Sequence, residues 1–247
     1  AVLSGEIRIG GLVSSLTDTV QMIPEQSCLL VSVEGQRITA VRPNLPVIPA
    51  SNMKLITAVA ALEVLGPDYV FTTKVVGVTE GNQVIGDLWL VGGGDPVLST
   101  VGYPATESYP TLHPTNIGAL IDALVAAGIT EITGNIVGDE SRYDTERFTP
   151  SLGLGVRTTE VGPLGALMLN DGVVLASPIK PDQPALSAAQ EFLRLLSERG
   201  IVVRGVAKIG SASVDIPVVA SINSAPFSAI VEEMLTNSDN NTAELML

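Results

Sequence analysis

The sequence predicts a fold that mixes helices and strands around a core of ordinary size. Three observations carry this prediction. An almost wholly apolar segment, 55–65, has the length of a helix; runs of β-prone residues flank short glycine-containing turns; and amphipathic segments of helical periodicity follow later in the chain. With 247 residues, 46% of them hydrophobic, the chain can form one large domain or two.

The first part of the chain is expected to hold a helix and a hairpin. Mixed apolar spacing predicts a short helix over 9–20, and two β-rich runs, 27–33 and 37–41, surround a glycine-containing turn. The single cysteine, Cys28, is expected to be a small buried residue, and it excludes an internal disulfide and a multi-cysteine metal site. Extended backbone is then favoured by three prolines, Pro43, Pro46 and Pro49.

A central helix is predicted between Pro49 and Gly66. Proline favours a helix start, and glycine followed by Pro67 ends the helix. Ser51 and Lys54 then lie on its first turn, where residues three apart share a face and backbone N–H groups have no helical partner. Because the helix is apolar on most sides, we expect it to be buried.

This placement indicates acyl transfer through a serine ester. Burial lowers the pKa of Lys54, so its neutral amine can take a proton from the Ser51 hydroxyl. The Ser-x-x-Lys pattern alone is weak evidence, because two common residues recur at this spacing in many proteins. The alternative is a solvated Ser/Lys pair that begins a core helix.

The middle of the chain is expected to form a module of strands and helices from about Thr73 to Ala220. A hairpin is predicted from runs 71–78 and 83–91, followed by the tight turn Gly92–Pro96, which lacks the pattern of a phosphate loop. Further on we expect a helix, a strand, a hairpin, a second helix and a second strand, at 116–127, 129–137, 166–175, 185–200 and 202–209.

The tail is predicted to hold two helices joined by a polar loop. An amphipathic helix covers 227–235, a second helical stretch covers 243–247, and Ser238-Asp239-Asn240 lies between them. Taken alone, such a loop is a capped helix-to-helix connection.

Composition and single residues exclude several function classes. The chain carries 13 basic and 26 acidic residues, a formal charge of −13, with the basic residues scattered, which argues against nucleic-acid binding. No apolar run is long enough to cross a bilayer, and no signal-peptide pattern is present. The single histidine, His113, lies in a loop-like stretch, and we expect it to be solvated. A Ser-His-Asp triad would have to use this histidine, and no Gly-x-Ser-x-Gly elbow accompanies it.

Ser-x-x-Lys and a later Ser-Asp-Asn form a pair that is known from active-site serine penicillin-recognising enzymes. The chain resembles the D-alanyl-D-alanine carboxypeptidase/endopeptidase family of low-molecular-mass penicillin-binding proteins, class C type. The resemblance extends in family order through four segments and covers the chain from about Gln26 onward: 49–62, 90–96, 134–139 and 238–244.

The resemblance implies an α+β fold, that of the penicillin-binding and serine β-lactamase-like transpeptidase domain, with a large inserted β-rich module. The transpeptidase-like domain would comprise 1–72 and 221–247, and the insert 73–220. Ser51 and Ser238 are 187 positions apart, which suggests an insert smaller than in the longest members.

The same resemblance implies the roles of six residues and needs neither cofactor nor metal. Ser51 would attack the D-Ala-D-Ala bond of a peptidoglycan stem peptide, with Lys54 as general base. Ser238 would pass the proton to the leaving D-alanine, and Asn240 would orient the peptide. Weak substrate-binding candidates at the rim are Asp139 and Tyr143. A β-lactam would acylate the same serine.

One family motif, Lys-Thr-Gly, is absent from this chain. In the family it lies on a strand beside the serine, supplies an oxyanion donor and binds the substrate carboxylate. The chain also ends within the apolar stretch Ala243–Leu247, which is an unusual natural terminus. We therefore expect an incomplete domain whose C-terminal portion is a separate or cleaved chain of the same protein.

The family also implies action outside the cytoplasmic membrane, in the periplasm or cell envelope, by a protein whose signal peptide has been removed. Two alternatives remain at this point. One is a serine β-lactamase of the same superfamily, for which no deacylating base is evident in the sequence. The other is a catalytically silent binding or scaffold homologue, which the missing third motif favours for this chain in isolation.

Overall fold

The structure is a computed structural model that describes residues 2–150, 152–157, 159–174 and 180–247. The chain divides into two compact units, Ala1–Asn52 and Met53–Leu247. None of the helices in the described ranges is both long and apolar enough to cross a bilayer.

The first unit holds one long helix and a hairpin, as the sequence predicts. Helix α1 (Val2–Gln21) is longer than expected, and it contacts the second strand of the antiparallel pair β1 (Leu29–Val33) and β2 (Gln36–Val41). The turn between the strands places Glu34 and Gly35 at positive φ, 49° and 79°, which suits a tight hairpin. The prediction for Cys28 is wrong, because this side chain is exposed just before β1.

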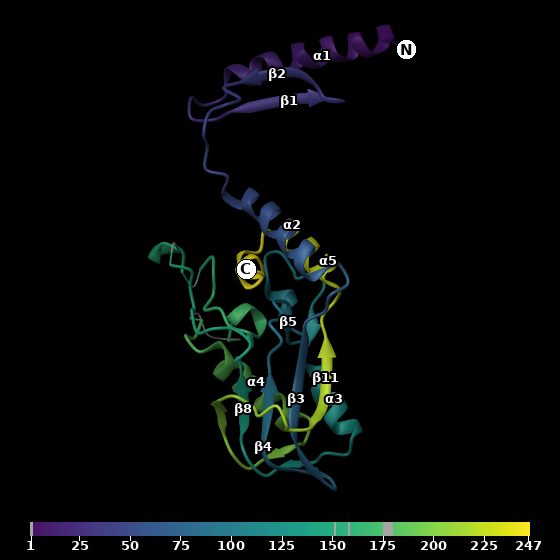
Figure 1. Ribbon diagram of the computed structural model, residues 1–247, viewed down its shortest axis with the longest axis vertical. Helices are drawn as coiled ribbons and strands as arrows, with labels where there is room; N and C mark the ends of the chain where they lie inside the picture. Colours follow the sequence, from purple (N-terminus) through teal and green to yellow (C-terminus); the bar gives the residue numbers. More distant parts are fainter. Residues whose placement is uncertain (1, 151, 158, 175–179) are drawn as a thin grey trace. The chain divides into compact units, whose positions relative to one another are not determined.

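The second unit mixes helices with a sheet (Figure 1). Its α-helices are α2 (Met53–Leu65), α3 (Gly118–Ala126), α4 (Pro184–Glu198), α5 (Phe227–Asn237) and α6 (Asn240–Leu245). The strands are β3 (Thr72–Glu80), β4 (Gln83–Val91), β5 (Leu98–Ser99), β6 (Thr115–Asn116), β7 (Glu131–Ile132), β8 (Ile136–Asp139), β9 (Val202–Val203), β10 (Ala207–Ile209) and β11 (Val218–Asn223). Its 3-10 turns are η2 (Pro104–Thr106), η3 (Leu154–Val156) and η4 (Asn170–Gly172), whereas η1 (Ala50–Asn52) belongs to the first unit.

The main sheet has the order β10-β8-β4-β3-β11, with β7 paired to β4 and β9 paired to β7. The hairpin β3–β4 and the pair β3–β11 are antiparallel, whereas β8 is parallel to both β4 and β10. Figure 1 shows β3, β4 and β11 running along the length of this unit. The sequence predicts the β3–β4 hairpin correctly, while it gives no signal for β11.

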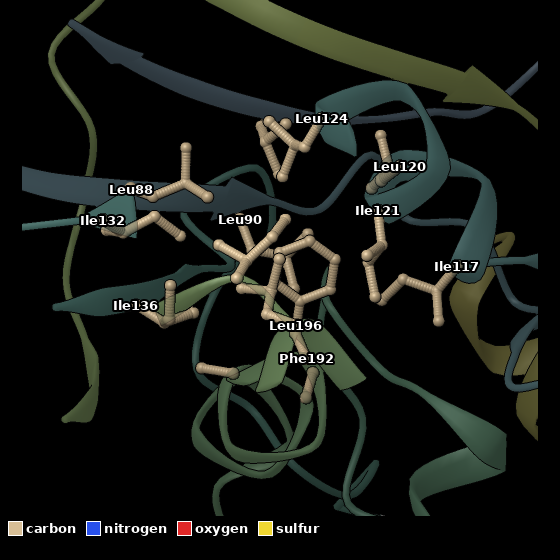
Figure 2. Close-up of a cluster of buried hydrophobic side chains, with 14 of the residues drawn as sticks. Leu88, Leu90, Ile117, Leu120, Ile121, Leu124, Ile132, Ile136, Phe192 and Leu196 are labelled. Atoms are coloured by element: carbon tan, nitrogen blue, oxygen red, sulfur yellow. The ribbon is translucent and has the colours of Figure 1, made fainter. Parts of the chain in front are cut away.

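Helices α3 and α4 bury the core of this sheet. Phe192 and Leu196 of α4 meet Leu120 and Leu124 of α3 over the side chain of Leu90 in β4 (Figure 2). All five side chains are completely buried. The apolar spacing that predicts these two helices is therefore the spacing of the face that covers the sheet.

A second, smaller core joins helices α2, α5 and α6. Ala58 of α2 packs in a cluster with Phe71, Phe227 and Met234. The two phenylalanine rings make an edge contact with a centroid distance of 6.1 Å. This core fixes the beginning of α2 relative to the loop between α5 and α6, where the sequence motifs lie.

Helix α2 is buried along one face only, so the prediction of a helix buried on most sides is wrong for this chain. Its contacts are with α5 and α6, and its buried residues are Lys54, Ala58 and Ala61. Leu55, Ile56 and Val59 are 54%, 62% and 69% exposed. The helix boundaries agree with prediction. The turn η1 and then α2 come directly after Pro49, and Gly66, with a φ of 83°, ends the helix.

Three further predictions need correction. The expected hairpin over 166–175 is absent from its described part, which forms the turn η4; Leu175 lies outside the described residues. The predicted strands 129–137 and 202–209 are each divided in two, because backbone bends separate β7 from β8 and β9 from β10. Helix α6 begins at Asn240 and ends at Leu245, earlier than the predicted 243–247.

Replacing Phe192 by alanine tests the importance of the sheet core. The ring is completely buried between the helices and β4, so its removal leaves a cavity and should lower the free energy of unfolding by about 3–5 kcal/mol. Urea unfolding followed by circular dichroism measures the change. The control Gln190→Ala alters an exposed side chain of the same helix and should change stability by less than about 0.5 kcal/mol. Equal effects of the two variants would contradict this account of the core.

Candidate active site

The structure brings Lys54, Ser238 and Asn240 together, and we call these three residues the Lys54 cluster. The Lys54 ammonium lies 3.4 Å from the Ser238 hydroxyl and donates to the Asn240 amide oxygen at 2.5 Å. Lys54 is the second residue of α2, whereas the other two residues flank the loop between α5 and α6. The two sequence motifs thus meet across 186 positions of the chain.

Ser51 precedes Lys54 by three residues along the chain. It lies on the 3-10 turn η1, and its side chain is exposed. The preceding residue, Ala50, has a positive φ of 48°, which non-glycine residues rarely adopt.

Local backbone chemistry shapes the loop that carries Ser238 and Asn240. Ser238 ends α5 in the left-handed conformation, with φ 56° and ψ 38°. Asp239 then caps α6 by accepting hydrogen bonds from the backbone N–H groups of Asn241 and Thr242, at 2.9 Å and 3.3 Å. The middle residue of the motif therefore has a structural task, which leaves its two neighbours to face Lys54.

Asn240 is held at both ends of its amide. The amide oxygen accepts from Lys54, and the amide nitrogen donates to the backbone carbonyl of Glu160 at 3.1 Å. These contacts determine which end of the amide faces the lysine. Sequence patterns do not predict this role of Glu160, since the residue contributes a backbone carbonyl from an irregular segment.

Burial lowers the pKa of the Lys54 ammonium, because a desolvated charge is disfavoured. The carboxylates of Asp239 and Glu244 act in the opposite direction and raise it. Only 7% of the Lys54 surface is exposed, and two of the oxygens that it contacts, the Ser238 hydroxyl and the Asn240 amide oxygen, are neutral. The cluster therefore favours a lysine that can lose its proton more readily than a solvated one.

A cavity of about 350 Å³ adjoins the loop of the Lys54 cluster. Ser238 and Asn240 line it together with five carboxylate residues, Glu107, Glu160, Asp171, Glu233 and Asp239. Within the described ranges, no group of three His, Cys, Asp or Glu side chains is arranged to hold a metal ion.

The two weaker candidates lie apart from these contacts. The Asp139 carboxylate at the end of β8 is buried and accepts from the backbone N–H groups of Ser141 and Ala212, at 2.8 Å and 2.7 Å. Tyr143 lines a separate cavity together with Glu244, and its ring packs against Gly94. Burial raises the pKa of the Tyr143 hydroxyl.

The His113 imidazole lies in a loop, as predicted. Its Nε2 atom is 3.2 Å from a carboxylate oxygen of Glu232 on α5.

Comparison with known sequences gives a family match over most of the chain. The model of the D-Ala-D-Ala carboxypeptidase 3 (S13) family matches residues 16–181 and 176–247. A carboxypeptidase of Mycobacterium tuberculosis is 27% identical over 248 residues, which is 99% of this chain and 49% of that protein. A D-alanyl-D-alanine carboxypeptidase of Actinomadura sp. is 37% identical over 103 residues, which is 41% of this chain and 16% of that protein.

Comparison with solved structures shows the fold. Penicillin-binding protein 4 from Haemophilus influenzae superposes with a TM-score of 0.71 at 19% identity, covering 95% of this chain and 64% of that one. This likeness confirms the predicted α+β fold of the penicillin-binding type. The chain spans about half the length of the mycobacterial relative and less than two thirds of the solved structure.

Titration of Lys54 tests the electrostatics of the cluster. We expect its pKa to lie below the usual value near 10.5, and we expect Glu244→Gln to lower it further, because that carboxylate favours the charged ammonium. NMR titration of the labelled lysine side chain measures both values. The control Glu63→Gln removes an exposed carboxylate from α2 itself. A Glu244→Gln variant with an unchanged or higher Lys54 pKa would show that this electrostatic assignment is wrong.

Proposed function

Because this chain belongs to the D-Ala-D-Ala carboxypeptidase 3 (S13) family, we propose that it forms the nucleophile-bearing part of a serine DD-peptidase. The proposed substrate is the terminal D-Ala-D-Ala bond, or a cross-linking peptide bond, of peptidoglycan stem peptides. One observation carries the proposal: Lys54, three residues after Ser51, contacts both Ser238 and Asn240. Two separate motifs of this family thus converge on one ammonium group.

In the proposed reaction, neutral Lys54 takes the proton of the Ser51 hydroxyl as its oxygen attacks the peptide carbonyl. The backbone N–H of Ser51 stabilises the oxyanion that forms. As the C–N bond breaks, Ser238 passes the proton from Lys54 to the departing amine, while Asn240 orients the peptide. Water then hydrolyses the Ser51 ester. A β-lactam acylates the same oxygen by opening its ring.

The assignment of Lys54 as base is supported by its surroundings. Two of its contacts are with neutral groups, the Ser238 hydroxyl and the Asn240 amide oxygen, and burial favours the neutral amine. Asp139 and Tyr143 remain weak candidates for substrate binding. The Asp139 carboxylate is already bonded to two backbone N–H groups, so it would act by shaping the rim, whereas the Tyr143 side chain borders a cavity.

We further propose a domain division into 1–72 plus 221–247 and an insert of 73–220. The two hydrophobic cores support it, since the sheet core draws on residues from Val75 to Ala220, with Ile222 just past the proposed boundary, and the smaller core joins α2, Phe71, α5 and α6. Among the described residues of the smaller core, Val97 alone lies inside the proposed insert.

The remaining part of the protein is proposed to complete the site. Lys-Thr-Gly is missing from the 247 residues, and the mycobacterial relative is about twice as long as its matched segment. We propose that a C-terminal portion of the same protein, present as a separate or cleaved chain, covers the exposed apolar face of α2 and supplies the third motif. The protein would act in the periplasm or cell envelope after removal of a signal peptide.

Penicillin labelling tests the nucleophile. With its C-terminal portion present, the protein should form a covalent adduct with a fluorescent penicillin, and Ser51→Ala should abolish that adduct because the attacking oxygen is gone. Denaturing electrophoresis measures the labelled fraction. The control Ser228→Ala, at an exposed serine on α5, should label like the unaltered protein.

Each other result of this labelling assay has a defined meaning. Persistent labelling of Ser51→Ala would refute Ser51 as the nucleophile. A short-lived adduct with rapid penicillin turnover would favour a β-lactamase. Binding of peptidoglycan fragments without any adduct, in the complete protein, would favour a silent scaffold.

Replacing Val59 by aspartate tests the proposed cover over α2. Val59 is 69% exposed in this chain, so the new carboxylate should hardly change the free energy of unfolding of the 247 residues alone. In the complete protein the same charge would be buried without a partner, which should cost at least about 3 kcal/mol. Urea unfolding of both proteins measures the two changes.

The control for this comparison is Val125→Asp, at an exposed valine of α3 outside the proposed contact. It should affect both proteins equally. If Val59→Asp also has equal effects in the two proteins, the C-terminal portion does not cover this face of α2.

A further inference from the structure

The side-chain amide of Asn241, next to the motif residue Asn240, is fixed at both ends. Asn241 is 2% exposed. Its amide oxygen accepts from the backbone N–H of Gly162 at 2.7 Å, and its amide nitrogen donates to the Asp171 carboxylate. A buried amide with both ends satisfied has one defined orientation, so these contacts hold the first turn of α6 against residues 162–171.

Asp171 is itself held in place by an ion pair and by its backbone. Its second carboxylate oxygen lies 3.1 Å from the Lys180 ammonium, which is largely buried. Asp171 and the preceding Asn170 both have positive φ values, 54° and 55°. The Asn170 amide oxygen accepts from the backbone N–H of Thr100 at 2.8 Å, so this uncommon turn is anchored on both sides.

The same region also holds Asn240. Its amide nitrogen donates to the carbonyl of Glu160, two residues before Gly162. Both asparagines of the α6 start are therefore bonded to a segment that ends at Asp171. The orientation that points the Asn240 oxygen at Lys54, at 2.5 Å, depends on this support.

We propose that Asp171 and Lys180 are positioning residues of the Lys54 cluster, acting through Asn241 on the loop that carries Ser238 and Asn240. This inference rests on the proposed DD-peptidase function. Neither residue is assigned contact with the reacting atoms. Their task is to keep the Asn241 amide oriented, and thereby to keep the Asn240 amide and the Ser238 hydroxyl within reach of Lys54.

The charge on Asp171 makes its support of Asn241 depend on pH. Burial raises the pKa of Asp171 to about 6; Lys180 and the Asn241 amide lower it, whereas Asp239 raises it. The hydroxyl of Tyr103 also senses the Asp171 charge. Below about pH 6, protonated Asp171 loses the charge that pairs with Lys180, so its support of Asn241 should weaken.

The test compares acylation rates in the complete protein by stopped-flow mixing with a chromogenic penicillin. Asp171→Asn and Lys180→Met should each lower the second-order rate of acylation at pH 7.5 by roughly tenfold to hundredfold, the loss expected from a misplaced catalytic group. The double variant should lose no more than the worse single variant, because the two residues act as one unit. Lys180→Arg keeps the positive charge and should retain most of the rate.

Matched controls come from a second Asp–Lys pair, Asp87 and Lys208, whose charged atoms are 3.0 Å apart in the main sheet. Asp87→Asn and Lys208→Met should leave acylation unchanged. The ratio of the unaltered rate to the Asp171→Asn rate should shrink as the pH falls through about 6, since the unaltered side chain then becomes neutral as well. A purely structural loss would keep this ratio constant.

The outcomes separate this inference from the function on which it rests. If the unaltered protein forms no adduct, the proposed DD-peptidase function is wrong. If it is acylated and the folded Asp171→Asn and Lys180→Met variants match it in rate and pH profile, the positioning role is overturned while the function stands. A folded variant with a reduced rate but a constant ratio across pH would also overturn it. Circular dichroism establishes that each variant is folded.

Discussion

The contact between the Lys54 ammonium and the Asn240 amide oxygen is the constraint on which the rest of the site depends. A buried ammonium is costly unless oxygen acceptors surround it, and here two acceptors come from a loop that includes Asn240, 186 positions away. The packing of α2 on α5 and α6 brings them within reach. The left-handed end of α5 and the Asp239 cap of α6 then fix the loop itself.

Ionisation of two carboxylates, buried Asp95 and partly buried Asp171, is disfavoured in the folded protein. Burial raises the pKa of both Asp95 and Asp171 from 3.8 to about 6. Their contribution to stability is therefore greatest below about pH 4 and is lost as the pH rises through about 6, when the folded protein must hold them ionised. Asp95 accepts from the backbone N–H of Val97, and Asp171 pairs with Lys180. Near neutral pH these specific contacts offset part of the cost of burying each charge.

Much of the fold and the two motifs could be predicted because the relevant signals are local. The hairpin β3–β4, helix α4 and the capped loop at Ser238 each follow from neighbouring residues. The Asn241–Asp171 bond could not be predicted, because it joins residues 70 positions apart in segments without periodicity. The predicted hairpin over 166–175 fails for a related reason: Asn170 and Asp171 have the left-handed conformation of a turn but use their side chains for tertiary bonds.

Helix α2 reverses the usual distribution of polar and apolar residues. It buries Lys54 while Ile56, Val59 and Val64 are exposed, Val64 by 83%. A surface helix of a complete domain would be expected to turn this apolar stripe inward. The reversal follows if the Lys54 side of α2 faces the loop that carries Ser238 and Asn240, and the opposite side receives the proposed C-terminal portion. The lysine is then buried by contacts within this chain, so its environment is already formed before the apolar face is covered.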